Sequence, residues 1–139
     1  MQLRELFLDD NELTGIIPPE LGQLANATYI ALAENHLSGV IPTAFGKLTS
    51  LERLDLQFNT LVGEVPAQLS STPLAKIKLE GNTFTGDIPV GVCQSVQFIS
   101  GNCAVNAPTR RPSSLVVART TPLLPPEWRC NCCTTCHSG

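Results

Sequence analysis

Apolar residues recur along the first two thirds of the chain with a fixed spacing. Leucine-type residues stand eight, five and three positions before an asparagine, and another apolar residue stands two positions after it. The pattern occurs four times, around Asn11, Asn35, Asn59 and Asn82, which are separated by 24, 24 and 23 residues. Self-similarity at a fixed period is the signature of a repeat architecture. The sequence therefore predicts four repeats, over residues 3–26, 27–50, 51–73 and 74–95.

Each repeat predicts a short strand, a turn and one turn of helix. The L-x-L core alternates with period two, so one face of the strand is buried and the other is exposed. A glycine four residues after the asparagine suits a tight bend where a Cβ would clash. A proline three residues later keeps the residue before it extended. The stretch after the proline, such as Glu20–Leu24, is a single 3₁₀ or short α turn.

The asparagine of each repeat lies where the chain leaves the predicted strand. Its side-chain amide can both donate and accept hydrogen bonds with the backbone of neighbouring coils. The four asparagines are therefore expected to form a ladder that satisfies buried backbone groups along the stack: Asn11, Asn35, Asn59 and Asn82.

These residues together resemble the leucine-rich repeat family, in its plant-type form with a G-x-I/V-P element. The resemblance covers residues 3–95 and implies an α/β solenoid, a horseshoe fragment of four repeats of 23–24 residues. Its parallel strands line the concave side, and its 3₁₀ or short helical turns line the convex side. Departures are few: Ala27 replaces a frame leucine, Val65 replaces isoleucine, the third repeat is one residue short, and the fourth ends its pattern at Cys93.

The two ends of the chain differ from the repeats. Family members usually carry an N-terminal cap with paired cysteines, and none precedes Leu3, so the sequence is expected to be a fragment, with a short uncapped solenoid or an edge-to-edge dimer as alternatives. No signal peptide is expected, because Arg4 and Glu5 interrupt any apolar run. Residues 96–129 read as a proline-rich linker or loop. Residues 130–139 form a cysteine-rich tail similar to tails of diatom and algal members of the family.

The cysteines allow three interpretations. Their even number fits three disulfides, which imply an oxidising compartment; the alternatives are a zinc site in the tail, with His137 as a ligand, and free thiols. The disulfide candidates are Cys93, Cys103, Cys130, Cys132, Cys133 and Cys136. Asn26 begins an Asn-Ala-Thr sequon, so it is a glycosylation candidate if the chain is secreted.

Composition and motifs exclude several classes of function. A net charge of −3 gives no reason to expect nucleic acid as a partner. No run approaches the roughly 20 apolar residues that cross a bilayer. The carboxylates are scattered, no phosphate-binding loop is present, and His36 is expected to be an exposed turn residue. We therefore expect no enzyme activity and no cofactor or resident metal.

Binding is expected on the concave sheet, which is the recognition surface of such solenoids. The candidate residues are Glu5, Phe7, Asp9, Tyr29, Arg53, Asp55, Gln57, Lys76 and Lys78. Aromatic and acidic residues gather in the first two repeats and basic residues in the last two, a polarity that suits a peptide or protein ligand.

The resemblance implies a non-enzymatic protein- or peptide-binding module, a fragment of a secreted or receptor-like protein at the cell surface, with a receptor partner or a membrane-anchored parent. The alternative is an extracellular structural protein or an inhibitor of hydrolases. Ice binding is disfavoured, because the column of hydroxyl residues that would serve it is predicted to lie in the turn beside the glycine. That column holds Thr14, Ser38, Thr60 or Val62, and Thr85.

Overall fold

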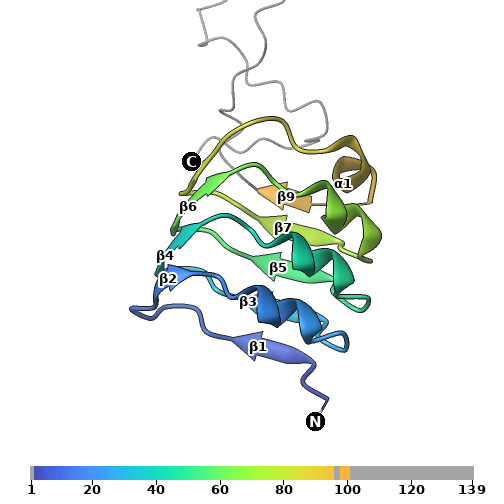
Figure 1. The fold of residues 1–139 in the computed structure, drawn as a ribbon, viewed down its shortest axis with the longest axis horizontal. Coiled ribbons are helices and arrows are strands. Elements are labelled where there is room, and N and C mark those ends of the chain that lie inside the picture. The colour runs from blue at the N-terminus through green and yellow to red at the C-terminus, as the bar shows by residue number, and fades with distance from the viewer. Residues whose placement is uncertain (1, 96–97, 101–139) are drawn as a thin grey trace, which may run out of the picture.

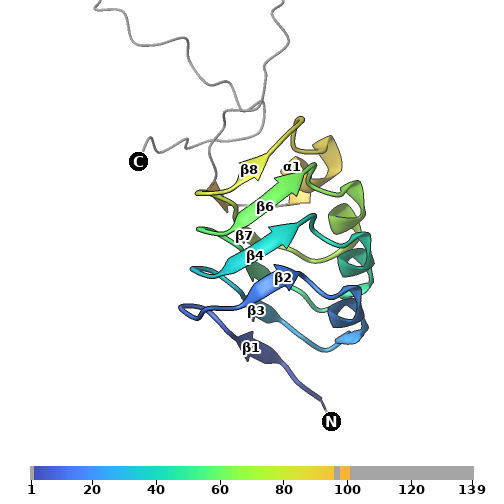
Figure 2. The same ribbon diagram turned by 60° about the vertical axis from the view of Figure 1, so that its left-hand side comes forward.

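The computed structural model describes residues 2–95 and 98–100 of the chain. Four coils stack along one axis, and each coil contributes one strand to each of two parallel sheets (Figures 1 and 2). A short helix completes each coil on the remaining side (Figure 1). The described residues therefore form the predicted α/β solenoid of parallel strands and 3₁₀ turns.

The first sheet has five strands in the order β1-β3-β5-β7-β9, all parallel. Their bounds are Glu5–Phe7 (β1), Tyr29–Ala31 (β3), Arg53–Asp55 (β5), Lys76–Lys78 (β7) and Phe98–Ser100 (β9). Equivalent positions of successive repeats lie side by side: Glu5 pairs with Tyr29, Tyr29 with Arg53, and Arg53 with Lys76. The repeat period alone predicts this register, because parallel strands of equal repeats stack without a shift.

Strand β9 lies within the segment that was expected to be a linker. The sequence indicates a proline-rich linker or loop over residues 96–129, yet Phe98–Ser100 pair with β7 and extend the first sheet by one strand. Ile99 lies opposite Ile77 in the backbone register. An apolar residue therefore continues the strand frame after the asparagine and proline signals of the repeat have stopped. The rest of the linker and the cysteine-rich tail lie outside the described residues.

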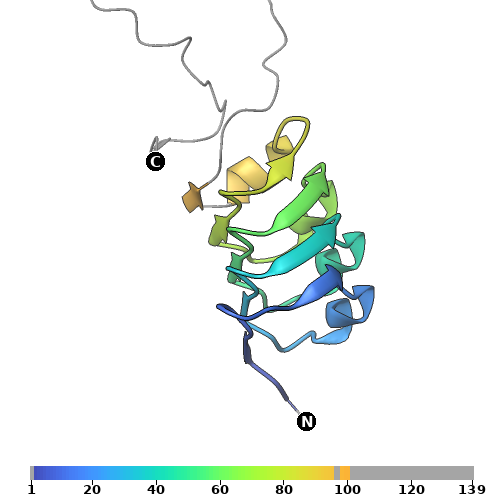
Figure 3. The ribbon, with the colours of Figure 1, turned by 90° about the vertical axis from the view of Figure 1, so that its left-hand side faces the viewer.

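The second sheet is a further difference from the sequence prediction. Its strands are β2 (Thr14–Ile16), β4 (His36–Gly39), β6 (Thr60–Gly63) and β8 (Thr83–Phe84), in that order and parallel (Figures 2 and 3). The sequence predicted only a turn here. In the two inner coils the residue two positions after the asparagine, Leu37 or Leu61, is buried and directly follows an exposed residue. Runs this short do not reveal a strand until the coils are stacked.

The helices are η1 (Pro19–Gln23), η2 (Thr43–Lys47), η3 (Ala67–Ser71) and the α-helix α1 (Val90–Ser95). Glycines let successive helices approach closely. A Cβ built on Gly46 would lie 2.7 Å from both Cβ and the carbonyl oxygen of Gln68, so the backbone of one coil rests on the next. Among the described residues, none of the helices is long and apolar enough to span a membrane.

The core runs continuously between the sheets and the helices. The apolar residues that recur at fixed positions of each repeat, such as Ile30, Leu54 and Ile77, are fully buried beyond the first coil. The third coil keeps this core although it is one residue short. There Thr72 is buried in the position that leucine takes in the two coils before, and its hydroxyl donates to the Leu69 carbonyl at 2.7 Å. The first coil differs, because its frame residues at the open edge of the stack, Leu3, Leu8 and Leu13, are exposed.

Candidate functional site

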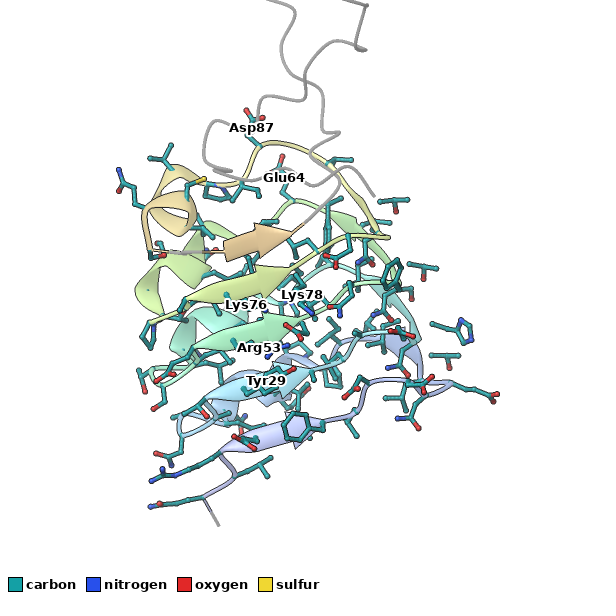
Figure 4. The ribbon with its side chains drawn as sticks, turned by 180° about the vertical axis from the view of Figure 1, so that it is seen from behind. Tyr29, Arg53, Glu64, Lys76, Lys78 and Asp87 are labelled. Atoms are coloured by element: carbon teal, nitrogen blue, oxygen red, sulfur yellow. The ribbon has the colours of Figure 1, made fainter. Side chains whose placement is uncertain are left out.

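The outer face of the first sheet carries a compact group of aromatic, basic and acidic side chains. We call the group of Tyr29, Arg53, Asp55 and Lys78 the central cluster. These residues come from three neighbouring strands, β3, β5 and β7. Figure 4 shows Tyr29, Arg53, Lys76 and Lys78 on successive strands of this face. The cluster exists because the repeat period places position 29 beside position 53 and position 55 beside position 78.

Asp55 lies at the centre of the cluster. Its carboxylate accepts two hydrogen bonds from the Arg53 guanidinium, from Nε at 3.1 Å and from Nη2 at 2.6 Å. The Tyr29 hydroxyl donates to it at 2.9 Å, and Lys78 Nζ lies 3.8 Å away. Bidentate and charge-assisted bonds of this kind are among the stronger side-chain hydrogen bonds. Asp55 therefore fixes Arg53 and Tyr29 by hydrogen bonds and pairs with Lys78 by charge.

The position of Asp55 corrects the expectation that it is an exposed binding residue. It is only 3% exposed, because side chains of both neighbouring strands cover it. A buried carboxylate requires partners that satisfy its charge, and Arg53, Tyr29 and Lys78 supply them. Asp55 is therefore a buried residue that orients the exposed side chains of this face, and it is not itself accessible to a ligand.

Burial and pairing shift the pKa values of Asp55, Tyr29 and Arg53. Burial by itself raises the pKa of Asp55, but the hydrogen bonds from Arg53 and Tyr29 and the charge of Lys78 outweigh it and hold the pKa below its usual value. Burial, followed by the hydrogen bond to Asp55, raises the pKa of Tyr29 to about 12. The bond to Asp55 also raises the pKa of Arg53. At neutral pH the cluster holds one anion, two cations and a neutral phenol.

Aromatic contacts extend the cluster toward β1. The rings of Phe7 and Tyr29 meet edge to face, with centroids 4.9 Å apart and planes at 89°. The Arg53 guanidinium lies over the Tyr29 ring, 4.3 Å from its centroid. Such contacts stabilise aromatic and cationic side chains at a surface. Three strands thus hold a continuous row of Phe7, Tyr29 and Arg53.

The remaining candidate residues lie around this row. Glu5, Phe7 and Asp9 are exposed in and beside β1, whereas Gln57, Lys76 and Lys78 are partly buried. The side-chain oxygen of Gln57 is buried and accepts no hydrogen bond from the described residues. The face therefore runs from acidic and aromatic at the first strand to basic at β5 and β7.

The sequence places Phe58 at an exposed position of the third repeat on this face, but Phe58 was not among the candidate binding residues. Phe58 follows Gln57 and is 55% exposed. It precedes the ladder asparagine, and the other three repeats have Asp10, Glu34 or Gly81 at this position. A single aromatic residue in a column of small or acidic residues is the signal in the sequence that could have identified it.

The asparagines bond between coils as well as within them. Asn35 Nδ2 donates to the Leu8 carbonyl of the preceding coil at 2.8 Å, and its Oδ1 accepts from Leu13 N at 3.0 Å. Asn59 and Asn82 repeat this pair of contacts one and two coils further on. Within the described part of the chain, the Asn11 side chain donates only to carbonyls of its own coil. The ladder stiffens the edge of the first sheet where its strands end.

Other candidate positions lie apart from this face. Asn26 is exposed between η1 and β3. Cys93 lies in α1 and is disulfide-bonded, and the other five cysteines are outside the described residues. His36 is exposed, as predicted, but it lies in β4. Within residues 2–95 and 98–100, no three metal-ligating side chains come together.

Comparisons with known proteins support the assignment of the repeats to the leucine-rich repeat family. The protein family described as "Leucine rich repeat" matches residues 1–61. No curated protein matches the chain.

Three solved structures illustrate the likeness. The plant peptide hormone receptor RGFR1, in complex with RGF2, is 34% identical with a TM-score of 0.66, and the match covers 71% of this chain and 18% of that one. The Arabidopsis receptor kinase HAESA, in complex with the peptide hormone IDA and the co-receptor SERK1, is 33% identical with a TM-score of 0.64, covering 70% and 18%. A plant ice-binding protein is 37% identical with a TM-score of 0.64, covering 71% and 33%. The chain thus spans less than a fifth of each receptor and a third of the ice-binding protein.

Proposed function

Taking as premise that this chain is a leucine-rich repeat protein, we propose that it is a non-enzymatic module that binds a peptide or protein on the outer face of its first sheet. The observation that carries the proposal is the central cluster with its neighbouring aromatic ring. Asp55 holds Arg53 and Tyr29 in place by hydrogen bonds, so these two side chains lose little conformational freedom when a ligand arrives, and Lys78 pairs with the same carboxylate at 3.8 Å.

The charges of the cluster indicate which part of a ligand it contacts. Asp55 carries one negative charge against the two cations that contact it, Arg53 and Lys78, and Lys76 lies beside Arg53 in the register. Phe7 offers an exposed ring against Tyr29, at the other end of the row that Arg53 continues. An acidic group of the ligand would meet the basic strands while an apolar side chain meets Phe7. Aromatic and arginine residues are enriched among the side chains that dominate binding energy.

The comparisons support this proposal at the level of the fold. RGFR1 and HAESA, which resemble this chain, were solved in complexes with RGF2 and with the peptide hormone IDA. Likeness to receptors and the disulfide at Cys93 also support an extracellular or cell-surface location, within a secreted or membrane-anchored parent. Intact mass of the secreted protein before and after reduction tests the location; a rise of about 6 Da is expected for three disulfides.

Binding is tested with random linear peptides displayed on phage and selected on the immobilised protein. Enriched peptides are then synthesised, and their affinities are measured by calorimetry. The Lys76→Glu, Lys78→Glu double variant is expected to weaken binding at least about tenfold, because it reverses the charge of the basic strands. The matched control is Lys47→Glu, which changes an exposed lysine on η2. Equal losses in the two proteins would contradict binding at this face.

A second candidate function is binding to ice, and the second sheet favours it. The hydroxyl column that was predicted to lie in turns begins on strands: Thr14 lies in β2, Ser38 in β4 and Val62 in β6, while Thr85 directly follows β8. The backbone register staggers these residues: Thr14 lies opposite His36, and Ser38 lies opposite Ile16 and Thr60. The column therefore follows the repeat period along the sheet without its members lying directly opposite one another. The likeness to a plant ice-binding protein points the same way.

Inhibition of ice recrystallisation is the measurement that separates this candidate from the first. Activity that Val62→Lys abolishes and the Lys76→Glu, Lys78→Glu variant retains would assign ice binding to the second sheet. Ice growth that matches a buffer control would remove ice binding as a candidate.

A further inference from the structure

Phe58 has a backbone conformation that its side chain disfavours. Its φ is +56°, in the left-handed region, and the equivalent residues of the other repeats, Asp10, Glu34 and Gly81, have φ values of +54°, +53° and +69°. Glycine adopts this region freely, and aspartate tolerates it. A bulky aromatic residue there is an outlier whose presence calls for a physical reason.

The backbone hydrogen bonds of Phe58 do not explain why an aromatic residue stands at this position. Phe58 N donates to the Glu80 carbonyl at 2.8 Å, and the Phe58 carbonyl accepts from Asn35 N at 3.3 Å. Any residue makes these bonds, and Asp10 and Glu34 make the corresponding N–H or carbonyl bonds in earlier coils. The bonds between coils therefore impose the left-handed conformation whatever the side chain is.

Packing in the core does not explain the aromatic residue at this position either. Phe58 remains 55% exposed, so its ring contributes little to the buried cluster of frame residues. The next repeat nevertheless leaves room for the ring, because it has a glycine, Gly81, at the equivalent position. A Cβ on Gly81 in the next coil would clash with Cδ1 of Phe58. The ring thus lies against the backbone of Gly81 on one side while more than half of the residue faces solvent.

The position of Phe58 joins it to the binding face. Only two residues separate it from Asp55, which is hydrogen-bonded to Arg53 and paired with Lys78. Three residues of extended chain span at most about 10 Å. A ligand that reaches the basic side chains of β5 and β7 therefore also reaches the Phe58 ring. An aromatic ring that is held on one side and exposed on the other offers contact area at a low entropic cost.

We propose that Phe58 is a specificity-determining anchor that receives an aromatic or aliphatic side chain of the peptide ligand. This proposal rests on the proposed function and goes further, because it predicts a ligand with an apolar side chain next to an acidic group. The acidic group meets Arg53 and Lys78, and the apolar side chain packs on the exposed side of the Phe58 ring.

The test uses the full chain and peptides selected from the displayed random library on the wild-type protein. Phe58→Asn is the informative variant, because asparagine tolerates the left-handed conformation better than phenylalanine does. Its midpoint of urea unfolding is expected to equal or exceed that of the wild type. Its affinity for the selected peptides is expected to fall at least about tenfold. The matched control is Val90→Asn, which removes an exposed apolar side chain from α1 (71% exposed) and leaves the affinity unchanged.

Different results separate the two proposals. Peptides that bind Phe58→Asn as tightly as the wild type but lose affinity for the Lys76→Glu, Lys78→Glu variant would overturn the anchor and leave the binding face in place. A lower unfolding midpoint for Phe58→Asn would overturn it too, because the ring would then serve the fold. A library that yields no binding peptide would overturn the peptide-binding function and the anchor together.

Discussion

Replacing Asn59 by alanine is expected to destabilise the protein far more than the same change at Asn11. Asn59 is 7% exposed, and its amide joins two coils. Nδ2 donates to the Leu32 carbonyl at 2.9 Å, and Oδ1 accepts from Leu37 N at 3.0 Å. Nδ2 also contacts the Leu56 and Gln57 carbonyls of its own coil.

The magnitude follows from which groups lose their partners. Leu37 N is buried and has Asn59 Oδ1 as its acceptor, and a buried donor without a partner costs about 1–3 kcal/mol. The Leu32 carbonyl keeps a hydrogen bond from Asn35 at 3.2 Å, so the lost bond there costs about 1 kcal/mol. The expected loss for Asn59→Ala is therefore about 2–4 kcal/mol.

Asn11 provides the matched control. It occupies the same position of the repeat but is exposed, and its amide bonds only to the carbonyls of Leu8 and Asp9 in its own coil. Asn11→Ala is expected to cost less than about 1 kcal/mol, since water replaces both bonds.

Urea unfolding followed by circular dichroism gives both differences in free energy of unfolding. If Asn59→Ala does not fold, Asn59→Asp keeps an acceptor for Leu37 N and is measured in its place. Equal losses for the alanine variants, or a loss at Asn59 below that at Asn11, would refute the view that bonds between coils make the ladder stabilising.

Three further predictions concern the coil contacts and the central cluster. Gly46→Ala is expected to lower the free energy of unfolding by about 1–3 kcal/mol in urea, because the added Cβ meets the Gln68 backbone; an unchanged midpoint would contradict the close approach of η2 and η3. The lowered pKa of Asp55 means that its ionised form stabilises the fold above the unfolded-state pKa of about 4, and that this stability is lost as the pH falls through the folded-state value. The stability difference between the wild type and Asp55→Asn should therefore shrink on acidification from pH 6, and a constant difference would argue against the ionised cluster. Burial and the bond to Asp55 should make Tyr29 ionise near pH 12 in a spectrophotometric titration of the folded protein, about two units above a free phenol, and normal ionisation near pH 10 would contradict both its burial and that bond.

The repeat frame could be predicted from the sequence because it depends on periods. Leucines at period two within each strand, and asparagines every 23–24 residues, determine which positions face the core and which strands are neighbours. The columns that bring position 5 beside 29, and 29 beside 53, follow from this arithmetic and are present in the first sheet. The solenoid of parallel strands and 3₁₀ turns was thus determined before any coordinates were known.

Properties that depend on contacts between coils could not be predicted in this way. Asp55 occupies a nominally exposed position of its strand, yet it is buried because Tyr29 and Lys78 reach it from neighbouring strands. The two-residue strand β8 and the three-residue strand β9 are too short to show a period of their own. The sequence determined the period and hence the stacking, whereas burial, charge pairing and the backbone strain at Phe58 were decided by tertiary structure, because each depends on atoms contributed by another coil.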